Sequence, residues 1–451
     1  MQEFLLANDK LITWGLFILL FFVFGVPFWW GRRKIQRHTE VQDIRAEKLG
    51  LKEPVSLYPK VDPDICIGSA GCIAACPEVD VLGLRNGQAI AVNKAHCVGH
   101  GACERSCPVD AITLVFGSAT RGVEIPRIKK NFETNVPGVF IVGELGGMGL
   151  IKNAFEQGKQ CLEYLLKDYY PITDKNNQVY DLVIVGAGPG GISASIEAKK
   201  HGLNFVTLER EDIGGTVRYY PRKKLVLTRP FSIPNYGKLN RTEIFKEELV
   251  DLWDELVKNN KLESHIRTHQ NVEKIIKSGD TFDVILANET IKANKVILAI
   301  GRRGTPRKLG IPGENLPNVA YNLKEPEHYT DDLITVVGGG DSAIEAAIAL
   351  SDQPNNLVRL SYRKNTFARL KEKNREKLEQ AVREERIELL LETEVVSNNL
   401  NNLQVKYSNG ELRTYKNNQL FIFIGGILPN QFLNDIGIQM DVKFGQPLGG
   451  Y

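Results

Sequence analysis

Cysteine is missing from residue 162 to residue 451 of this 451-residue chain. Six of its seven cysteines lie between residues 66 and 107, and the seventh is Cys161. A secreted fold held by disulfides spreads its pairs along the chain, so this distribution excludes a disulfide scaffold and favours metal ligands in a reducing compartment. Cys161, within a helical pattern, is expected to be a packed core residue.

An excess of charge of one sign is also missing. Lys and Arg number 57 and Asp and Glu number 54, which gives a net charge of +3. This balance gives no reason to expect a nucleic-acid partner. A chain of this length should form two to four domains with sizeable cores.

No charged residue occurs between Leu11 and Trp30. Twenty helical residues rise roughly 30 Å, about the hydrocarbon thickness of a bilayer, and basic residues follow directly after the run. A cleaved signal peptide would place its positive charge before a shorter apolar run that ends in small residues. We therefore expect a single transmembrane anchor in residues 1–31, a charged juxtamembrane helix and linker in 32–59, and the remaining chain on the cytoplasmic side of the inner membrane.

The six clustered cysteines follow one spacing twice. DICIGSAGCIAACP (64–77) and AHCVGHGACERSCP (95–108) both show C-x2-C-x2-C-x3-C-P with the second cysteine replaced, once by Ser69 and once by His100. In this motif three thiolates hold one iron–sulfur cluster and the cysteine before the proline holds the other. The spacing therefore predicts two sites, one formed by Cys66, Cys72 and Cys107 and the other by Cys76, Cys97 and Cys103.

Residues 60–117 as a whole resemble a two-cluster bacterial ferredoxin, which is a small α+β domain. The segment VLGLRNGQAIAVN between the two motifs is typical of a hairpin that turns at Asn86-Gly87. With three cysteines each, the sites can hold [3Fe–4S] clusters, or [4Fe–4S] clusters completed by His100, by Ser69 or by solvent. Structural zinc is the alternative for such a group of Cys and His residues.

A dinucleotide-binding fingerprint begins at Gly186. YDLVIVGAGPGGISASIEAKKHG (180–202) reads as a buried strand, a G-x-G-x-x-G turn and a helix, and the next strand ends on Glu209. The first glycine permits the tight turn, the second lets amides approach a pyrophosphate, the third packs helix on strand, and the acid binds ribose hydroxyls. The residues expected to bind FAD here are Gly186, Gly188, Gly191, Glu209 and Gly215.

A second fingerprint lies in LITVVGGGDSAIEAAIAL (333–350). The strand that follows it ends on Tyr362 and Arg363 rather than on an acid. Arginine at this point suits the 2′-phosphate of NADPH, whereas a carboxylate would favour NADH. Alternatively, the arginines only solvate a surface turn. The residues expected to bind NADPH are Gly338, Gly340, Ser342, Arg363 and Arg369.

Two such units in one chain resemble bacterial thioredoxin reductases. The resemblance is carried by VVGGGDSAIEAA, AIGRRGTPRKLGIPGE, FIFIGGILPN and VPGVFIVGE. Related members include ferredoxin–NADP reductases of the thioredoxin-reductase type and bacillithiol disulfide reductases. The resemblance implies two Rossmann-like α/β domains, one for FAD in residues 178–301 with a return in 426–451, and one for NADPH in 302–425. A homodimer is possible by this resemblance, which does not decide the oligomeric state.

One family motif stands outside its usual order. In the family, the segment PGVFAAGD and the helix after it end the chain, whereas here the matching VPGVFIVGE precedes Gly186. This order implies a circular permutation in which residues 118–170 complete the FAD domain; an unrelated linker is the alternative. By the resemblance, Glu144 matches the aspartate that contacts the ribityl chain, and Asn153 and Ala154 begin the helix next to the flavin.

The reducing dithiol of thioredoxin reductases is missing as well. The matching stretch NVAYNLKEPEHYTDD (318–332) has no cysteine, so no thiol pair can relay electrons there and no catalytic side chain is predicted. We expect hydride transfer from NADPH to FAD, then single-electron exchange with the clusters and with a redox protein, quinone or thiol. Two alternatives stay open, a reductase of a low-molecular-weight disulfide at the flavin and a non-enzymatic redox sensor or anchoring subunit.

Overall fold

The computed structural model of the chain forms two compact units. The first comprises the residues up to 121 together with Gly445–Pro447, and the second comprises Gly122–Phe444. The described residues are 9–54, 57–78, 80–120, 122–147, 149–168, 179–220, 222, 224–227, 231–233, 237–239, 244–302, 304–367 and 370–447.

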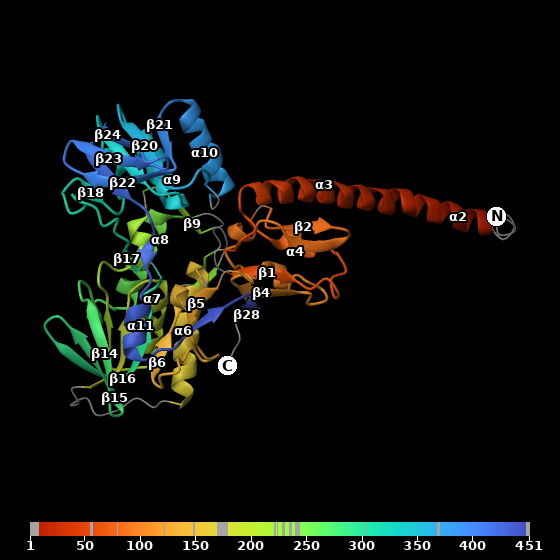
Figure 1. Cartoon of the computed structure of the whole chain (residues 1–451). Coiled ribbons are helices and arrows are strands. Elements are labelled where there is room, and N and C mark those ends of the chain that lie inside the picture. Colours follow the sequence, from red (N-terminus) through yellow and green to blue (C-terminus); the bar gives the residue numbers. More distant parts are fainter. Residues whose placement is uncertain are drawn as a thin grey trace. The chain divides into compact units, whose positions relative to one another are not determined.

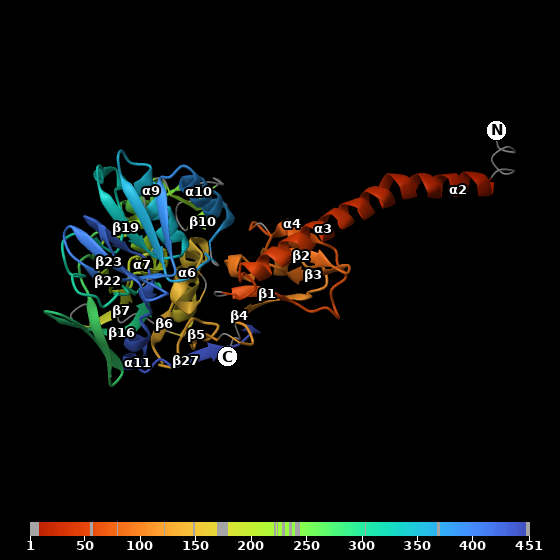
Figure 2. The same ribbon diagram turned by 45° about the horizontal axis from the view of Figure 1, so that its top comes forward.

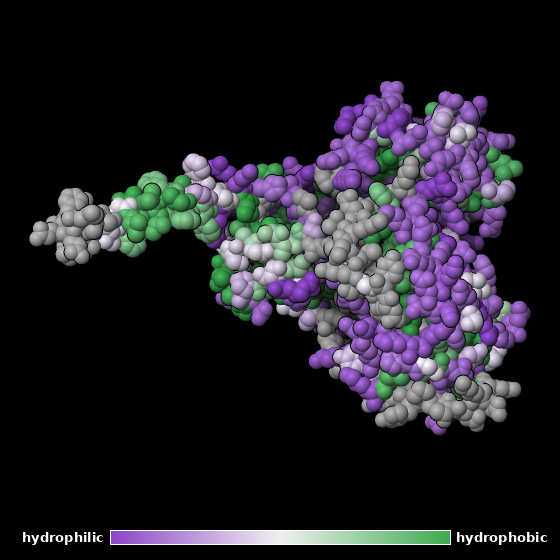
Figure 3. All heavy atoms as spheres, turned by 180° about the vertical axis from the view of Figure 1, so that it is seen from behind, coloured by the Kyte–Doolittle hydropathy of each residue, from purple (hydrophilic) through white to green (hydrophobic). Residues whose placement is uncertain are grey.

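One long helix begins the first unit (Figure 1). α2 (Asp9–Leu20) continues through a π-helical turn, η1 (Phe21–Gly25), into α3 (Val26–Lys48). The apolar side chains are exposed, Trp14 by 69% and Trp30 by 66%, and Figure 3 shows them as a hydrophobic surface. By length and composition alone, this helix could cross a membrane. It runs past the boundary expected at residue 31 because the single glycine there, Gly31, costs a helix only about 1 kcal/mol and does not interrupt it.

The rest of the first unit is a small ferredoxin-like layer. β1 (Leu57–Val61) pairs antiparallel with β4 (Ile112–Phe116). β2 (Leu82–Arg85) and β3 (Gln88–Ala91) form a hairpin, and its turn has φ of 50° at Asn86 and 81° at Gly87, the left-handed pair that a two-residue hairpin turn requires. The hairpin at Asn86-Gly87 is thus confirmed. The short helices of this layer are α4 (Gly71–Ala75), η2 (Lys94–His96) and α5 (Ala102–Arg105).

Two segments of the first unit differ from the expected boundaries. Pro59, expected in the linker, lies in β1, which is an edge strand and therefore loses no ladder bond at a proline. β28 (Gln446–Pro447), expected to return to the FAD domain, pairs antiparallel with β4 instead. Gly445 N–H donates to Phe116 O at 2.7 Å, which starts this pairing.

A seven-stranded sheet organises the first half of the second unit. Its order is β13 (Ile266–Arg267), β8 (Phe205–Leu208), β7 (Val179–Val185), β16 (Thr290–Leu298), β15 (Thr281–Leu286) and β14 (Val272–Ser278). β6 (Val139–Ile141) lies parallel to the last three residues of β16, with Val296 opposite Val139. The segment before the fingerprint therefore joins the same sheet as the fingerprint strand β7.

Helices cover one face of this sheet. They are α6 (Ile151–Asp168), α7 (Pro189–Lys200) and α8 (Lys246–Asn259). Leu182 and Ile184 of β7 pack among these helices, while Val183 and Val185 point to the other face, which α11 (Asn430–Ile436) helps to cover. α6 and α7 lie side by side in both ribbon views (Figures 1 and 2).

A five-stranded parallel sheet organises the second half. Its order is β18 (Val319–Ala320), β25 (Gln419–Ile422), β19 (Leu333–Val337), β20 (Leu357–Tyr362) and β21 (Ile387–Leu391). α9 (Asp341–Ser351) and α10 (Glu372–Arg383) pack on it, and a meander of β22 (Thr393–Asn398), β23 (Asn402–Tyr407) and β24 (Leu412–Lys416) follows. The seven-stranded sheet is mixed, because β15 pairs antiparallel with both β14 and β16, whereas the five-stranded sheet is parallel throughout. Two such sheets with flanking helices are the α/β architecture that the fingerprints predict.

Short elements complete the second unit. Pairs of short strands are β5 (Val123–Pro126) with β27 (Met440–Lys443), β9 (Leu225–Leu227) with β12 (Ile244–Phe245), β10 (Phe231–Ile233) with β11 (Gly237–Leu239), and β17 (Thr305–Pro306) with β26 (Gly426–Ile427). The 3-10 turns are η3 (Gly143–Gly146), η4 (Gly215–Tyr219) and η5 (Pro326–His328).

Candidate cofactor sites

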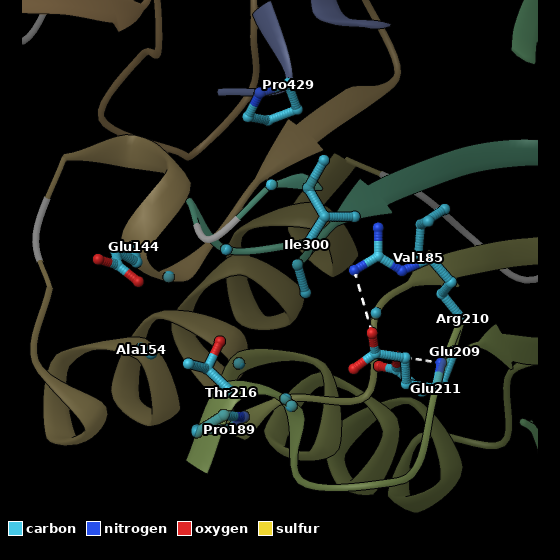
Figure 4. Close-up of a pocket in the computed structure, with 18 of the residues that line it drawn as sticks. Glu144, Ala154, Val185, Pro189, Glu209, Arg210, Glu211, Thr216, Ile300 and Pro429 are labelled. Atoms are coloured by element: carbon cyan, nitrogen blue, oxygen red, sulfur yellow. Dashed lines mark hydrogen bonds and ion pairs between the residues drawn. The ribbon is translucent and has the colours of Figure 1, made fainter. Parts of the chain in front are cut away.

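A cavity of about 570 Å³ opens at the carboxyl ends of β7 and β16 (Figure 4). Segments that are far apart in the chain line it: residues 142–154, 185–190, 208–220, 299–304 and 427–432. This is the crevice outside the strand ends where open α/β sheets bind their ligands. The predicted FAD residues that line it are Gly186, Gly188, Glu209, Gly215, Glu144 and Ala154.

The turn at Gly186 leaves room only for glycine. Gly186 has φ of 102°, and a Cβ on Gly191 would lie 1.8 Å from the Gly186 carbonyl oxygen. On the cavity side, a Cβ on Gly215 would come within 3.0 Å of the Gly188 Cα. The two facing glycines and the start of α7 at Pro189 leave backbone N–H groups open to a pyrophosphate, so the turn fits a dinucleotide.

Glu209 closes this turn from the end of β8. One carboxylate oxygen accepts from Ala187 N–H at 2.6 Å and the other from Glu211 N–H at 2.9 Å. The residue is only 9% exposed. Each carboxylate oxygen can accept more than one hydrogen bond, so ribose hydroxyls can still donate to Glu209 while it fixes the backbone of Ala187.

The segment from Val139 to Ala154 reaches the same cavity. After β6, Gly143 takes φ of 80° and its N–H donates to the Gln157 side chain of α6 at 2.8 Å. This bond ties the turn to the helix, so that Glu144 and Ala154 both face the cavity across from Pro189 (Figure 4). The structure therefore brings the turn and the Gly186 fingerprint together, as predicted.

Glu144 is the acidic side chain on that wall. Surrounding protein atoms raise its pKa, while the charge and the backbone N–H of Arg302 act in the opposite direction. Arg302 also donates from its guanidinium to Glu124 O at 3.3 Å. The cavity wall thus holds a carboxylate that can accept hydrogen bonds from hydroxyl groups of a ligand.

Not every predicted FAD residue contacts the cavity. Gly191 packs against the turn, which is the structural role of the third glycine. Asn153 lies in the first turn of α6, next to Ala154, and is not among the lining residues.

The second fingerprint is formed as a turn between β19 and α9. Gly338 has φ of 148°, and a Cβ there would lie 2.4 Å from the Phe423 carbonyl oxygen. Gly340, Ser342 and Arg363 are exposed at the carboxyl ends of β19 and β20, where a second dinucleotide would bind. Arg369, the other predicted NADPH residue, lies outside the described residues.

One set of three cysteines surrounds a small cavity in the first unit. Cys76, Cys97 and Cys103 line it together with His100. Burial, together with the smaller effect of the charges of Cys103 and Cys76, raises the pKa of the Cys97 thiol to about 12. These are the residues predicted for one cluster, with His100 in reach of the same space.

The other set gathers around Cys72. Burial, together with the smaller effect of the charges of Cys103, Cys66 and Cys107, raises the pKa of Cys72 to about 11. Ser69 is exposed, and its hydroxyl accepts from Gly71 N–H at 3.4 Å. Thiols with raised pKa stay protonated at neutral pH unless a metal stabilises the thiolates, so both sets suit metal binding.

The spacing of the donors bears on the zinc alternative. Among the described residues, no three His, Cys, Asp or Glu side chains surround one point closely enough for a single metal ion. A tetrahedral zinc site needs its donors about 2 Å from one ion, whereas a cluster of iron and sulfide spaces its thiolates more widely.

Some residues that line the cavity or support its wall were not predicted from the sequence. They include Arg302 beside Glu144, Gln157 on α6, and the wall from Ile427 to Phe432. The motif FIFIGGILPN, which carries the family resemblance and ends just before Gln431, is the sequence signal for the wall from Ile427 to Phe432. Arg302 lies in AIGRRGTPRKLGIPGE, which also carries the resemblance, but its contact with Glu144 depends on a partner more than 150 residues away.

Comparisons with known proteins agree with both sites. Residues 183–448 match the family described as pyridine nucleotide-disulphide oxidoreductase, and residues 58–108 match a 4Fe-4S dicluster domain. A ferredoxin–NADP reductase of Ignicoccus hospitalis is 30% identical over 42% of this chain and 57% of its own length. A bacilliredoxin reductase of Bacillus subtilis is 27% identical over 59% of this chain and 82% of its own length.

Solved structures show the same fold. The bacillithiol disulfide reductase of Bacillus cereus has a TM-score of 0.51 and 25% identity over 58% of this chain and 82% of its own. That of Staphylococcus aureus has a TM-score of 0.52 and 24% identity over 58% of this chain and 81% of its own. Since the family match covers more than half of the chain and confirms the predicted oxidoreductase class, this chain belongs to the pyridine nucleotide-disulphide oxidoreductase family and carries a 4Fe-4S dicluster domain ahead of it.

Proposed function

We propose that this protein is a membrane-anchored oxidoreductase that moves electrons between NADPH, FAD and two iron–sulfur clusters, and to or from a redox partner. The observation that carries the proposal is the pairing, in one chain, of the Gly186–Glu144 cavity with two sets of three cysteines. FAD, when bound, takes two electrons as a hydride and passes them on one at a time. Each NADPH thus supplies one electron for each of two clusters and leaves as NADP⁺.

The FAD domain is a circular permutation of the family arrangement. Support comes from β6, which lies beside β16, and from Glu144 and Ala154, which line the cavity although they precede Gly186 in the chain. The family match begins only at residue 183, so the segment at 118–170 supplies a wall that the matched part lacks. Glu144 contacts the ribityl chain, and the start of α6 approaches the flavin ring.

The second turn binds NADPH, and each cysteine set holds one cluster. The exposed guanidinium of Arg363 at the end of β20 supports the 2′-phosphate assignment. His100 supplies the fourth ligand of the Cys97 set, because it lines the same cavity, while Ser69 or solvent completes the Cys72 set. The apolar helix before Arg32 anchors the protein in the inner membrane, with the remaining chain in the cytoplasm.

A second candidate function is reduction of a low-molecular-weight disulfide at the flavin. It is favoured by the likeness to bacillithiol disulfide reductases, which extends over 58% of this chain. In that case the clusters tune or sense the flavin rather than carry its electrons. A sensor without turnover would be a third case, and NADPH oxidation with ferricyanide excludes it.

Replacing one cluster ligand separates the first two functions. Cys103→Ala removes a ligand of the second set and should lower the iron content by about half. NADPH-dependent reduction of a one-electron acceptor such as cytochrome c should then fall, and the EPR signal of one reduced cluster should disappear. Reduction of bacillithiol disulfide should be unchanged.

Cys161→Ala is the matched control, because Cys161 is fully buried among apolar side chains of the second unit, whereas both cysteine sets belong to the first. It should leave iron content and both activities as in the wild type. If the EPR signals in the wild type do not respond to NADPH, the proposed route through the clusters is wrong. If only disulfide reduction is found, the second candidate stands.

A further inference from the structure

The cysteine loop of the first motif lies beside the end of the apolar helix. The Arg32 guanidinium donates to Gly87 O at the hairpin tip, at 3.0 Å. A Cβ on Gly68 would lie 2.8 Å from the same guanidinium and 1.7 Å from Gly87 O. Arg32, the hairpin tip and the loop from Asp64 to Ser69 therefore meet at one point.

The helix is also fixed along the hairpin. Thr39 accepts from Leu84 N–H at 3.0 Å while its hydroxyl donates to Ile35 O at 2.8 Å. At the preceding residue, the His38 ring is 2.6 Å from an Asp80 carboxylate oxygen. These contacts hold α3 parallel to the hairpin, so the position of the loop relative to the helix is set within one packed unit.

Two large apolar side chains of this loop are left uncovered. Ile65 is 47% exposed and Ile67 is 62% exposed. Cys66 between them is turned inward, and its sulfur accepts from Ala89 N–H at 3.4 Å. The alternation puts both isoleucines on the outer side of a loop whose inner side holds a cluster ligand.

The loop lies close to the level of the last tryptophans. Arg32 follows Trp30 by two residues, a helical rise of only about 3 Å. The Arg33 guanidinium lies 3.8 Å from the Trp29 ring centre. Aromatic rings followed directly by arginines are the usual boundary between hydrocarbon and head groups, and basic side chains attract anionic lipids there.

We propose that Ile65 and Ile67 dock on the lipid surface and form a second membrane contact beside the helix. The inference rests on the membrane anchor of the proposed function. Because the helix already holds the loop at the bilayer, the two side chains insert at high effective concentration and need little affinity of their own. The set of Cys66, Cys72 and Cys107 is then the one nearer the membrane, since Ala95 before the other motif bonds to Leu51 beyond the far end of α3.

Photocrosslinking in the full-length chain tests this contact. Benzoylphenylalanine replaces Ile67, and the expressed protein is irradiated in native membranes and analysed for acyl-chain adducts by mass spectrometry. Ile44 gives the matched control, because it is 58% exposed on the same unit but lies about 18 Å further along α3 from Arg32. Phe22, in the apolar run and 63% exposed, reports on the anchor itself.

The expected result is lipid adducts at positions 22 and 67 and none at position 44. Adducts at 22 without adducts at 67 overturn the docking proposal and leave the anchor standing. Protein adducts at 67, from a second copy or another chain, also overturn it. The absence of lipid adducts at 22 overturns the anchor, and the docking contact with it. Iron–sulfur absorbance in each variant verifies that the substituted loop still folds.

Discussion

At the residue scale, Glu144 is the side chain that most directly tests the cavity. It lines the wall opposite Pro189, and its carboxylate can accept hydrogen bonds from ligand hydroxyls. Hydrogen bonds to a charged group contribute about 1.5–3 kcal/mol, so Glu144→Ala should weaken FAD binding about ten- to a hundred-fold. Titration of the flavin-free protein with FAD, followed by fluorescence, measures this change.

The control for Glu144 is chosen from the same segment. The Glu156 side chain on α6 is 44% exposed and forms an ion pair with Lys152 at 3.8 Å, so Glu156→Ala should bind FAD as the wild type does. Glu144→Asp restores the residue found in the family and should recover most of the affinity. Unchanged FAD affinity in Glu144→Ala would show that the wall at Glu144 does not face the flavin.

Glu314 is a second residue with a defined electrostatic role. Its carboxylate accepts from Leu309 N–H and Gly310 N–H, both at 2.6 Å, and from the Tyr321 hydroxyl at 2.7 Å. Despite burial, these bonds lower the pKa of Glu314. Because the folded pKa lies below the unfolded value of about 4.3, its stabilisation is complete above that value and is lost as the pH falls through the folded pKa.

Glu314→Gln should therefore destabilise the second unit at pH 7, by roughly 2–3 kcal/mol for a buried charge-assisted network. Thermal melts at pH 7 and pH 3 should show that the melting temperature falls less on acidification in the variant than in the wild type. Glu327→Gln, at an exposed site 13 residues along the chain, should change neither the stability at pH 7 nor the loss of stability at pH 3. Equal acid sensitivity of Glu314→Gln and the wild type would contradict this role.

At the scale of elements, the contact between α6 and α7 holds the early segment against the fingerprint helix. Gly158 lies in that contact, and a Cβ there would come within 2.3 Å of Gly190 O and 2.9 Å of Ser193 Cβ. Helix propensity alone would make Gly→Ala stabilising by about 1 kcal/mol. The packing argument predicts the opposite sign, so the two explanations can be separated.

Gly158→Ala should destabilise the second unit by about 1–3 kcal/mol, the usual cost of overpacking, and should lower FAD retention after gel filtration. Lys159→Ala is the control on the next residue, where the side chain is 41% exposed and pairs with Glu163 at 3.6 Å. It should leave melting temperature and FAD content nearly unchanged. A more stable Gly158→Ala protein would mean that α6 does not dock closely on α7.

The elements differ in how far the sequence predicts them. The hairpin turn at Asn86-Gly87 and the strand–turn–helix at Gly186 are encoded locally, since each needs left-handed glycines at fixed positions. β28 is a two-residue strand that pairs with β4 more than 300 residues away, and two residues carry no periodicity. Arg302 and Gln157 support the site through tertiary contacts, with Glu144 and with Gly143 N–H respectively. A local sequence pattern does not predict such contacts.

At the scale of the whole molecule, the FAD cavity is assembled from both sides of the fingerprint. Residues 142–154 come before Gly186, and residues 427–432 come more than 200 residues after it. β5 pairs with β27 just outside the cavity, and the Arg127 guanidinium reaches Asp441 at 2.8 Å. The ferredoxin-like layer therefore leads directly into a strand that is clamped to the C-terminal part of the flavin-binding fold.

Docking of the cluster loop on lipid would decide which acceptor the whole chain serves. A quinone dissolved in the bilayer takes two electrons, delivered singly, and two protons to become a quinol, while NADPH becomes NADP⁺. Burial of an isoleucine contributes about 1.5–3 kcal/mol, so Ile65→Ser/Ile67→Ser should reduce the docked population about ten-fold or more. NADPH–quinone activity in liposomes should fall by about the same factor.

Ferricyanide in water does not need the docked state, so its reduction by the same variant should stay within about two-fold of the wild type. Ile44→Ser/Ile276→Ser removes two isoleucines of similar exposure, 58% and 50%, that do not belong to the loop, and should preserve both activities. Equal loss of both activities in the loop variant would point to a damaged cluster rather than to lost docking. Full quinone activity in the loop variant would place the partner in water, and the cluster that serves it away from the membrane.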